Sequence, residues 1–337
     1  MRKIIITALK YIGFLAAGIF LFWLVYKDLE LDTLLNELSN LNYWWLVLSF
    51  AIGIFSHISR AIRWNMLIKP LGFKPKTINT FLSVMVMYLV NLALPRAGEV
   101  ARCSVLSRYE KVPFSKLVGT VVVERTSDFI ALLFFAFFIM LTQIGVFRNF
   151  LLSNPESQDK LVALFSTRNI IIGITIIIFL FVSFFIFRKA FKKTKFYNKI
   201  ASFAENFVEG IKAILKLENK WLYIGHTVFI YIIWFIALYL IFFCFKPTAH
   251  LSIFAAAVAL VMGGLAMIAP VQGGIGPWHF MVIETLFIYG IDRTNGKIFA
   301  LIAHAANNLS LMFIGAVALV ILPIINKNYE ATPLQNE

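Results

Sequence analysis

Long apolar runs constrain this chain more than any other feature. Several of them reach the roughly 20 residues that a helix needs to cross a bilayer. Of the 337 residues, 60% are hydrophobic, and the mean hydropathy is +0.83. The sequence therefore predicts an all-α, polytopic membrane protein.

Six of the runs are predicted to be full transmembrane helices, at residues 4–26, 43–67, 117–142, 169–187, 221–245 and 298–322. The first run follows the basic residues of Met1-Arg2-Lys3, a pattern that also occurs in signal peptides. Its apolar part is longer than the roughly 7–15 residues of a signal peptide, so we expect an uncleaved span. Lysine and arginine collect in alternate connections, which marks these connections as cytoplasmic.

This charge bias predicts a multi-pass protein of the cell (inner) membrane with cytoplasmic N- and C-termini. Residues 146–168 are then an external loop, and residues 326–337 a cytoplasmic tail. The basic segment 188–220 has apolar residues at spacings of three and four, which predicts an amphipathic helix on the inner leaflet. A solvated linker is the alternative for this segment.

Two further apolar segments are interrupted by a Pro-x-x-Gly sequence, at 95–98 and at 270–273. If residues 77–94 crossed the membrane, the basic stretch that follows would lie outside, against the charge bias. We therefore expect re-entrant helical hairpins over residues 77–109 and 251–290, which enter from opposite sides. Broken helices at membrane depth are tolerated where protein or a water-filled cavity surrounds them. Both breaks are therefore candidate binding sites.

Residues 1–145 and 169–325 have the same order of elements. Each half has two spans, a broken hairpin and a last span with polar residues. Because three full spans is an odd number, the two halves would lie in opposite orientations. Inverted repeats with discontinuous helices are the plan of many secondary transporters.

The first half carries charged candidates for a substrate-binding site: Arg60, Arg63, Arg96, Glu99, Arg102, Glu124, Arg125 and Asp128. Arg96, Glu99 and Arg102 are three residues apart, so a helix would stack them along one face. Glu124 and Asp128 form an i,i+4 pair inside an apolar run. A charge at the bilayer centre costs several kcal/mol unless it is paired or hydrated, so these groups should face one another or a cavity.

The functional hypothesis is that the arginines hold a lipid phosphate, because the guanidinium group matches phosphate geometry. The carboxylates would hold the arginines, and could bind a cationic headgroup or a coupling proton. In the alternative interpretation the charges pair only to lock the hairpin against its neighbouring span. Arg60 and Arg63 could equally be ordinary anchors at a cytoplasmic span end.

The second half carries neutral candidates for substrate binding: Gly273, Gly274, Gly276, His304, Asn307 and Asn308. The glycines precede a helix that starts near Pro277, where backbone N–H groups attract phosphate or carboxylate. A tight turn also needs glycine, so both interpretations stand. His304 is either a buried hydrogen-bonding group or a proton relay.

Four motifs resemble the lysylphosphatidylglycerol synthetase transmembrane region, a flippase-like family. They are 59–64 (Ser-Arg-Ala-Ile-Arg-Trp), 94–99 (Leu-Pro-Arg-Ala-Gly-Glu), Glu124-Arg125 with Asp128, and 273–276 (Gly-Gly-Ile-Gly). The resemblance covers nearly the whole chain. It implies a membrane protein that handles a lipid, in bifunctional relatives by moving an aminoacylated phospholipid between leaflets. We expect a stand-alone membrane domain without the aminoacyl-transferase domain, so the substrate of those relatives is not carried over.

The resulting prediction is a flippase-like transporter that moves a phospholipid or related amphipathic lipid, with an anionic phospholipid headgroup as partner. The alternatives are a scaffold or accessory subunit for a lipid- or glycan-modifying enzyme, and an intramembrane lipid transferase. The sequence contains no GxSxG, HExxH, Walker or nucleotide-binding motif, so we expect no enzyme activity and no cofactor. Cys103 and Cys244 are isolated, so neither a metal site nor a disulfide framework is expected. The net charge of +14 does not indicate nucleic acid, because the basic residues lie between apolar runs. A partner enzyme and a homo-oligomer stay open.

Overall fold

The computed structural model describes residues 16, 18–94, 97–153, 166, 168–169, 171–172, 175, 205, 207–269 and 271–327. In these residues all regular structure is helical, which confirms the all-α prediction. Four of the described helices are long and apolar enough to cross a membrane: α3 (Tyr43–Ile68), α6 (Phe114–Ser153), α10 (Lys220–Phe242) and α13 (Arg293–Ile325). Residues 18–26, from the predicted first span, are helical as well.

The shorter helices are α2 (Leu31–Ser39), α4 (Thr77–Ala93), α5 (Gly98–Glu110), α11 (Ile253–Ala266) and α12 (Pro277–Ile288). Three short 3-10 turns join them: η1 (Lys69–Leu71), η2 (Lys246–Thr248) and η3 (Gln272–Gly274). Most of the predicted span 169–187, most of the basic segment 188–220, and the tail from 328 lie outside the described residues. Pro95, Arg96 and Pro270 lie outside them too.

The predicted boundaries of two spans were wrong. The helix expected to end at 142 continues as α6 to Ser153, because apolar residues recur beyond Gln143 and the next proline is Pro155. Gln143 is buried and accepts a hydrogen bond of 2.9 Å from the Tyr289 hydroxyl. The last helix begins at Arg293 rather than 298, where the carboxylate of Asp292 caps it by accepting from the Asn295 backbone N–H at 3.0 Å.

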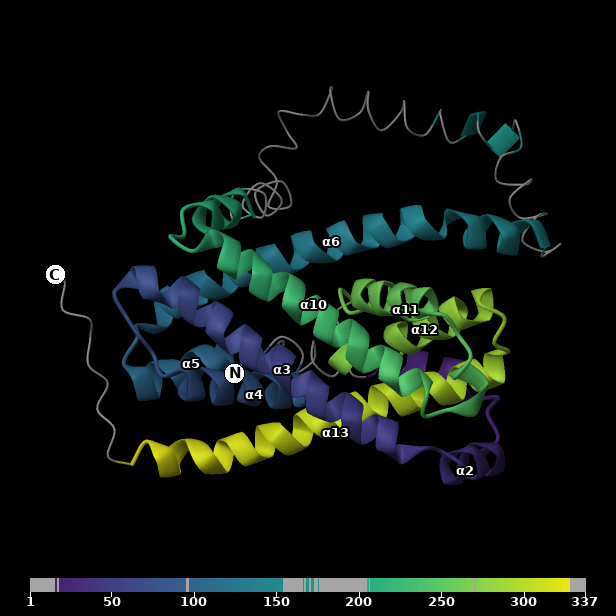
Figure 1. Cartoon of the computed structure of the whole chain (residues 1–337), viewed down its shortest axis with the longest axis horizontal. Helices are drawn as coiled ribbons and strands as arrows, with labels where there is room; N and C mark the ends of the chain where they lie inside the picture. The colour runs from purple at the N-terminus through teal and green to yellow at the C-terminus, as the bar shows by residue number, and fades with distance from the viewer. Residues whose placement is uncertain are drawn as a thin grey trace, which may run out of the picture.

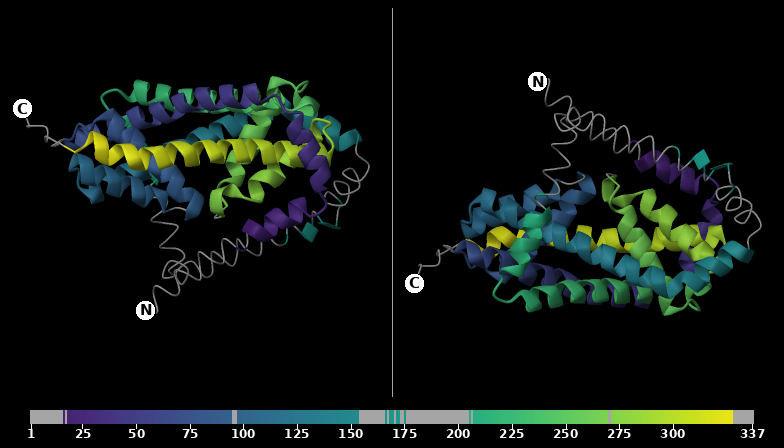
Figure 2. Two further views of the ribbon diagram at one scale, coloured as in Figure 1. Left: turned by 90° about the horizontal axis from the view of Figure 1, so that it is seen from below. Right: turned by 90° about the horizontal axis from the view of Figure 1, so that it is seen from above.

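Figure 1 shows the four long helices running along the long axis of the molecule, with α4 and α5 in its left half and α11 and α12 in its right half. The two further views in Figure 2 keep the same division. α4 packs against α5, and α11 packs against α12, so each pair forms a helical hairpin. The hairpins start from opposite ends of the molecule, and their broken ends meet near the middle.

The packing among α3, α4, α5 and α6 is repeated among α10, α11, α12 and α13. The pairs α3–α4, α4–α5, α5–α6 and α4–α13 have the counterparts α10–α11, α11–α12, α12–α13 and α11–α6. α3 and α10, which are equivalent in this scheme, also pack on each other. Every major contact between helices therefore has an equivalent in the other half.

The buried apolar residues divide into two large clusters, one around each hairpin. Trp64, Met85 and Leu106 belong to the cluster around α4 and α5, while Phe242 and Phe299 belong to the one around α11 and α12. The outer face of the molecule is apolar in turn: α6 exposes large side chains such as Phe134, Phe137, Phe138 and Leu141. An exposed apolar surface of this kind suits lipid rather than water.

Candidate functional site

The two breaks are joined by a side chain that the sequence analysis did not consider. Gln272, in the second break, donates through Nε2 to the carbonyl oxygens of Leu92 (2.6 Å) and Ala93 (2.9 Å) at the C-terminal end of α4. These carbonyls would otherwise lack a helical partner. In the first break, the Gly98 N–H donates to Asn91 Oδ1 at 2.9 Å. Any Cβ at Gly98 would collide with the Met87 carbonyl oxygen, so α5 can approach α4 this closely only with glycine there.

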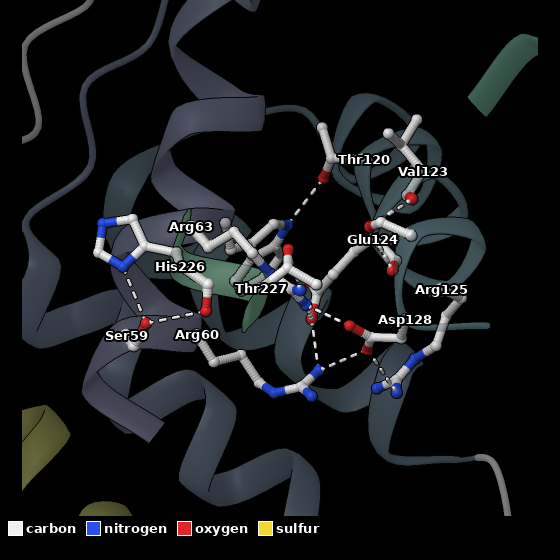
Figure 3. Close-up of polar contacts among 12 residues, drawn as sticks. Ser59, Arg60, Arg63, Thr120, Val123, Glu124, Arg125, Asp128, His226 and Thr227 are labelled. Atoms are coloured by element: carbon white, nitrogen blue, oxygen red, sulfur yellow. Dashed lines mark hydrogen bonds and ion pairs between the residues drawn. The ribbon is translucent and has the colours of Figure 1, made fainter. Parts of the chain in front are cut away.

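Five charged side chains from three helices form a buried ion cluster beside the first hairpin. They are Arg60 and Arg63 from α3, Arg102 from α5, and Glu124 and Asp128 from α6. Figure 3 shows the residues of α3 and α6 in this cluster. The i,i+4 spacing puts Glu124 and Asp128 on one face of α6. The side chains are 0–2% exposed, apart from 14% for Asp128.

Each arginine of the ion cluster contacts a carboxylate directly. Arg60 Nη1 lies 2.6 Å from Glu124 Oε1 and 3.1 Å from Asp128 Oδ2. Arg63 Nη2 lies 2.6 Å from Asp128 Oδ1 and 3.4 Å from Glu124 Oε1. Arg102 Nη1 lies 2.9 Å from Glu124 Oε2. Three guanidinium groups thus share two carboxylates, and the buried cluster has an excess of one positive charge.

Aromatic rings surround these arginines. The guanidinium carbon of Arg102 lies 4.4 Å from the centroid of the Trp64 ring, and that of Arg60 lies 5.4 Å from the Trp234 ring. Contacts of this geometry stabilise a cation that has lost its water. Nevertheless, Nε and Nη2 of Arg102 have no hydrogen-bond partner among the described residues. The positive charge is therefore only partly compensated.

Arg125 and Glu99 form the accessible edge of the ion cluster. Arg125 Nη2 lies 3.1 Å from Glu99 Oε1, and the two side chains are 41% and 28% exposed. Arg125 Nη1 also lies 3.6 Å from Asp128 Oδ2. In the part of the chain that the structure describes, these are the most exposed charges connected to the cluster, so a ligand would meet them first.

Glu99 and Arg102 of α5 both contact α6, through Arg125 and Glu124 respectively. Of the two interpretations for Arg60 and Arg63, the anchor at a span end does not fit, because α3 continues past them to Ile68 and both are buried. Arg96 lies outside the described residues.

The second break is a glycine turn with its polar groups directed inward. Gly273, Gly274 and Gly276 have φ values of 57°, 76° and 92°, which favour glycine. The Gly276 N–H donates to His279 Nδ1 at 3.3 Å, and a Cβ on Gly276 would meet Cβ of Leu21 at 2.5 Å. The geometry fits the tight turn, and the Gly276 N–H is not open to a phosphate.

His304, from α13, is tied to this turn. Its Nε2 lies 2.8 Å from the Gly273 carbonyl oxygen, and its Nδ1 lies 3.1 Å from Asn308 Nδ2. Its ring packs at 4.4 Å from the His279 ring and 5.1 Å from the Trp278 ring, centroid to centroid. This is the arrangement of a buried hydrogen-bonding histidine.

A cavity of about 290 Å³ lies between the two halves. α3, α4, α10, α11, α12 and α13 all contribute to its wall, as does the Gly273 turn. Of the sequence candidates, Gly273, His304, Asn307 and Asn308 line it. The sequence analysis missed the other polar wall residues, chiefly His57 and Tyr88. His57 could have been found, because it precedes Arg60 by one helical turn on the same face of α3.

Among the described residues, no group of three or more His, Cys, Asp or Glu side chains could hold a metal ion. Cys103 and Cys244 are both buried and free.

The fold and the site together define a helical membrane protein with a central cavity and a buried ion cluster. The family described as "Lysylphosphatidylglycerol synthase TM region" matches residues 10–315, and the chain belongs to this family. The chain is also similar to a UPF0104 membrane protein of Methanocaldococcus jannaschii, with 34% identity over 113 residues. That match covers 33% of this chain and 34% of the relative, about a third of each. No solved structure matches the chain.

Proposed function

We propose that this protein is a flippase-like transporter that moves a phospholipid or related amphipathic lipid between membrane leaflets. The observation that carries this proposal is the cavity whose wall comes from both halves of the chain. Its volume of about 290 Å³ lies at the lower end of the range for small-molecule sites, so it suits a headgroup rather than a whole lipid. The acyl chains would stay in the bilayer.

The packing supports the proposed topology of six spans and two re-entrant hairpins in an inverted repeat. Exchanging α3–α6 with α10–α13 reproduces the pattern of helix contacts. The hairpins α4–α5 and α11–α12 start from opposite ends of the molecule, as inverted halves require (Figure 1). In this topology the headgroup passes between the hairpins while the halves rock.

The distribution of charge supports cytoplasmic termini in the inner membrane. Asn79, near the start of α4, is hydrogen-bonded to Asn326, just after α13, so these two ends lie together. Basic side chains concentrate at this end: Lys69, Lys74, Lys76, Arg108, Lys111, Lys116 and Lys327. The positive-inside rule assigns such an end to the cytoplasm.

We propose that Arg125 provides the contact for a lipid phosphate. It is partly exposed and lies 3.1 Å from Glu99, with the weaker partners Asp128 and the Met87 sulfur each at 3.6 Å. A phosphate that approaches could replace Glu99 and form charge-assisted hydrogen bonds with the guanidinium group. Arg60, Arg63 and Arg102, which are buried, would hold α6 in place for this exchange.

One observation favours the second candidate, a scaffold for a lipid- or glycan-modifying enzyme. The buried arginines already have carboxylate partners, as expected if the ion cluster serves only to fasten α3, α5 and α6 together. A scaffold would tolerate changes at the exposed pair Arg125–Glu99. A transporter would not.

The test is reconstitution into liposomes with a fluorescent phosphatidylglycerol, whose accessibility to an external quencher reports movement between leaflets. We expect the wild type to move the lipid and Arg125→Gln to slow it at least about tenfold, since a hydrogen bond to a charged group contributes about 1.5–3 kcal/mol. The matched control is Arg293→Gln, at another partly exposed ion pair in which Arg293 Nε lies 3.0 Å from Glu284 Oε1. A folded Arg125→Gln protein with the wild-type rate would contradict the role of Arg125. A wild type that moves no lipid would favour the scaffold.

A further inference from the structure

Three polar side chains in the cavity wall have no hydrogen-bond partner among the described residues. They are the buried Nδ1 of the His57 imidazole from α3, the hydroxyl of the half-buried Tyr88 from α4, and the amide of Asn307 from α13, which is exposed. Other polar groups of the wall are satisfied within the protein: the Ser49 hydroxyl donates to the Ala237 carbonyl at 2.8 Å, and His304 bonds the Gly273 carbonyl. Polar groups at membrane depth are costly to leave unpaired, so the three free ones indicate a hydrogen-bonding ligand or water.

The wall of the cavity carries no charged side chain in the part of the chain that the structure describes. The nearest arginine of the ion cluster by contact is Arg60, whose guanidinium faces the ring of Trp234, itself a wall residue, at 5.4 Å. Nη1 of Arg60 is occupied by Glu124 and Asp128. Nε of Arg60 has no hydrogen-bond partner among the described residues, but the side chain is 2% exposed and does not line the cavity, so a phosphate inside would contact no charged side chain there. A phosphate would bind more favourably at Arg125, which does not line the cavity, than inside it.

Aromatic rings line the cavity together with the free polar groups. The rings of Tyr88, Trp234 and Trp278 all line it, and the His57 ring packs 5.0 Å from that of Tyr88. Flat apolar faces beside hydroxyl, amide and imidazole groups match a ligand whose own surface alternates C–H and O–H groups. Glycerol and sugar rings have this surface. An acyl chain would leave the polar groups unpaired.

From this lining we infer that the cavity binds a neutral polyhydroxyl group, such as the glycerol headgroup or the sugar ring of a membrane lipid. The inference rests on the proposed transport function and names the part of the substrate that enters the cavity. About 290 Å³ is the liquid volume of roughly ten water molecules, enough for one such group and a few waters. The phosphate of a phosphoglycerolipid would stay with Arg125.

The test is a binding measurement on the full chain in nanodiscs. Binding is detected as a change in intrinsic tryptophan fluorescence, to which Trp234 and Trp278 contribute. The probes are dihexanoyl glucosyl-diacylglycerol, which has a neutral sugar, and dihexanoyl phosphatidic acid, which has the same chains and a phosphate without further hydroxyls. In an Arg125→Gln background, which removes the proposed phosphate contact, we expect the glucosyl lipid to bind at least about tenfold more tightly than phosphatidic acid, because several hydroxyls each gain a partner. Equal binding, or tighter binding of phosphatidic acid, would overturn the inference.

Two variants locate the binding in the cavity. Tyr88→Phe and Asn307→Leu keep the approximate volume and remove one free polar group each, so each should lower the preference for the sugar about threefold to tenfold. Ser49→Ala is the matched control, because its hydroxyl is already bound to the Ala237 carbonyl and should leave the preference unchanged. A preference for the sugar that survives both variants would overturn the cavity as its site.

Competition with free glucose distinguishes a lipid headgroup from a free polyol as the natural ligand. If it does not displace the glucosyl lipid at millimolar concentration, the cavity recognises a lipid headgroup; if it does, the free polyol is a ligand itself. The leaflet assay separates this inference from the proposed function. Selective binding without lipid movement would support the polyhydroxyl site and contradict the proposed transport function. Lipid movement without selective binding would support transport and contradict the polyhydroxyl site.

Discussion

The two broken hairpins have the same backbone plan, but the buried polar side chains around one are charged and those around the other are neutral. Beside α4 and α5, the side chains that hold the neighbouring helices together are charged, as in Arg102 with Glu124. Beside α11 and α12 the buried polar groups are neutral, as in His304 with the Gly273 carbonyl, and the ion pair Arg293–Glu284 is partly exposed. The cavity lies between these two regions and takes its wall from both. Equivalent interruptions of a helix can therefore be stabilised by an ion cluster or by neutral hydrogen bonds.

This difference has consequences for stability and for function. A buried charge is tolerated only while its partner remains, whereas a neutral group that loses its partner costs much less. The charged half should thus be sensitive to single substitutions and the neutral half tolerant of them. In the charged half, the partly exposed Arg125 at the edge of the ion cluster offers a cation to a phosphate.

The largest effect should follow from Glu124→Ala. The carboxylate contacts Arg60, Arg63 and Arg102, and its loss would leave Arg60 and Arg63 with Asp128 and remove the carboxylate that Arg102 contacts. Breaking a buried ion pair from one side costs about 3–5 kcal/mol. Thermal unfolding in detergent should show a strongly lowered Tm or no folded protein.

His304→Ala, in the neutral half, should destabilise the protein less than Glu124→Ala does. It removes hydrogen bonds between uncharged groups, each with a net contribution of about 0.5–1.5 kcal/mol, and leaves a small void. A Tm for this variant as low as that of Glu124→Ala would contradict the proposed asymmetry between the halves.

A smaller effect should follow from Gln272→Ala, which removes the link between the two breaks. The Leu92 and Ala93 carbonyls would lose their side-chain donor, at a cost of about 1–3 kcal/mol if no water replaces it. We expect faster amide hydrogen exchange at the end of α4 and in the Gln272 turn together. Faster exchange in one of the two segments only would show that the breaks are held independently.

The smallest effect belongs to Asp292, an exposed charge at the start of α13 in the neutral half. Partial burial raises its pKa, but the hydrogen bonds from the Asn295 backbone and side-chain amide outweigh burial and hold the pKa below its usual value. Asp292→Ala should cost about 1 kcal/mol, the typical contribution of an N-cap.

The pH dependence of this cap has a definite sign. Because the folded pKa is lowered, the contribution of Asp292 is complete above the ordinary aspartate pKa of about 3.9 and is lost as the pH falls through the lower, folded value. The difference in Tm between wild type and Asp292→Ala should therefore be constant near neutral pH and disappear in strong acid. A difference that grows in acid would contradict this assignment.

Much of the fold follows from the sequence alone. Apolar runs of membrane length determine where helices form, and the Pro-x-x-Gly sequences determine where two of them break, since both signals act within one or two turns. The i,i+4 spacing of Glu124 and Asp128 likewise determines that both carboxylates share a face of α6. The family could be recognised from such local motifs.

The tertiary structure alone decided which partners these residues have. Arg60 and Glu124 are 64 positions apart in sequence, and Gln272 lies 180 positions from Leu92. No periodicity within a helix encodes such a contact, because it depends on how whole helices pack. For the same reason the sequence left open whether Arg60 and Arg63 are anchors at a span end, whereas both lie buried in the ion cluster. His57 and Asn307 become wall residues of one cavity only when α3 and α13 are brought together.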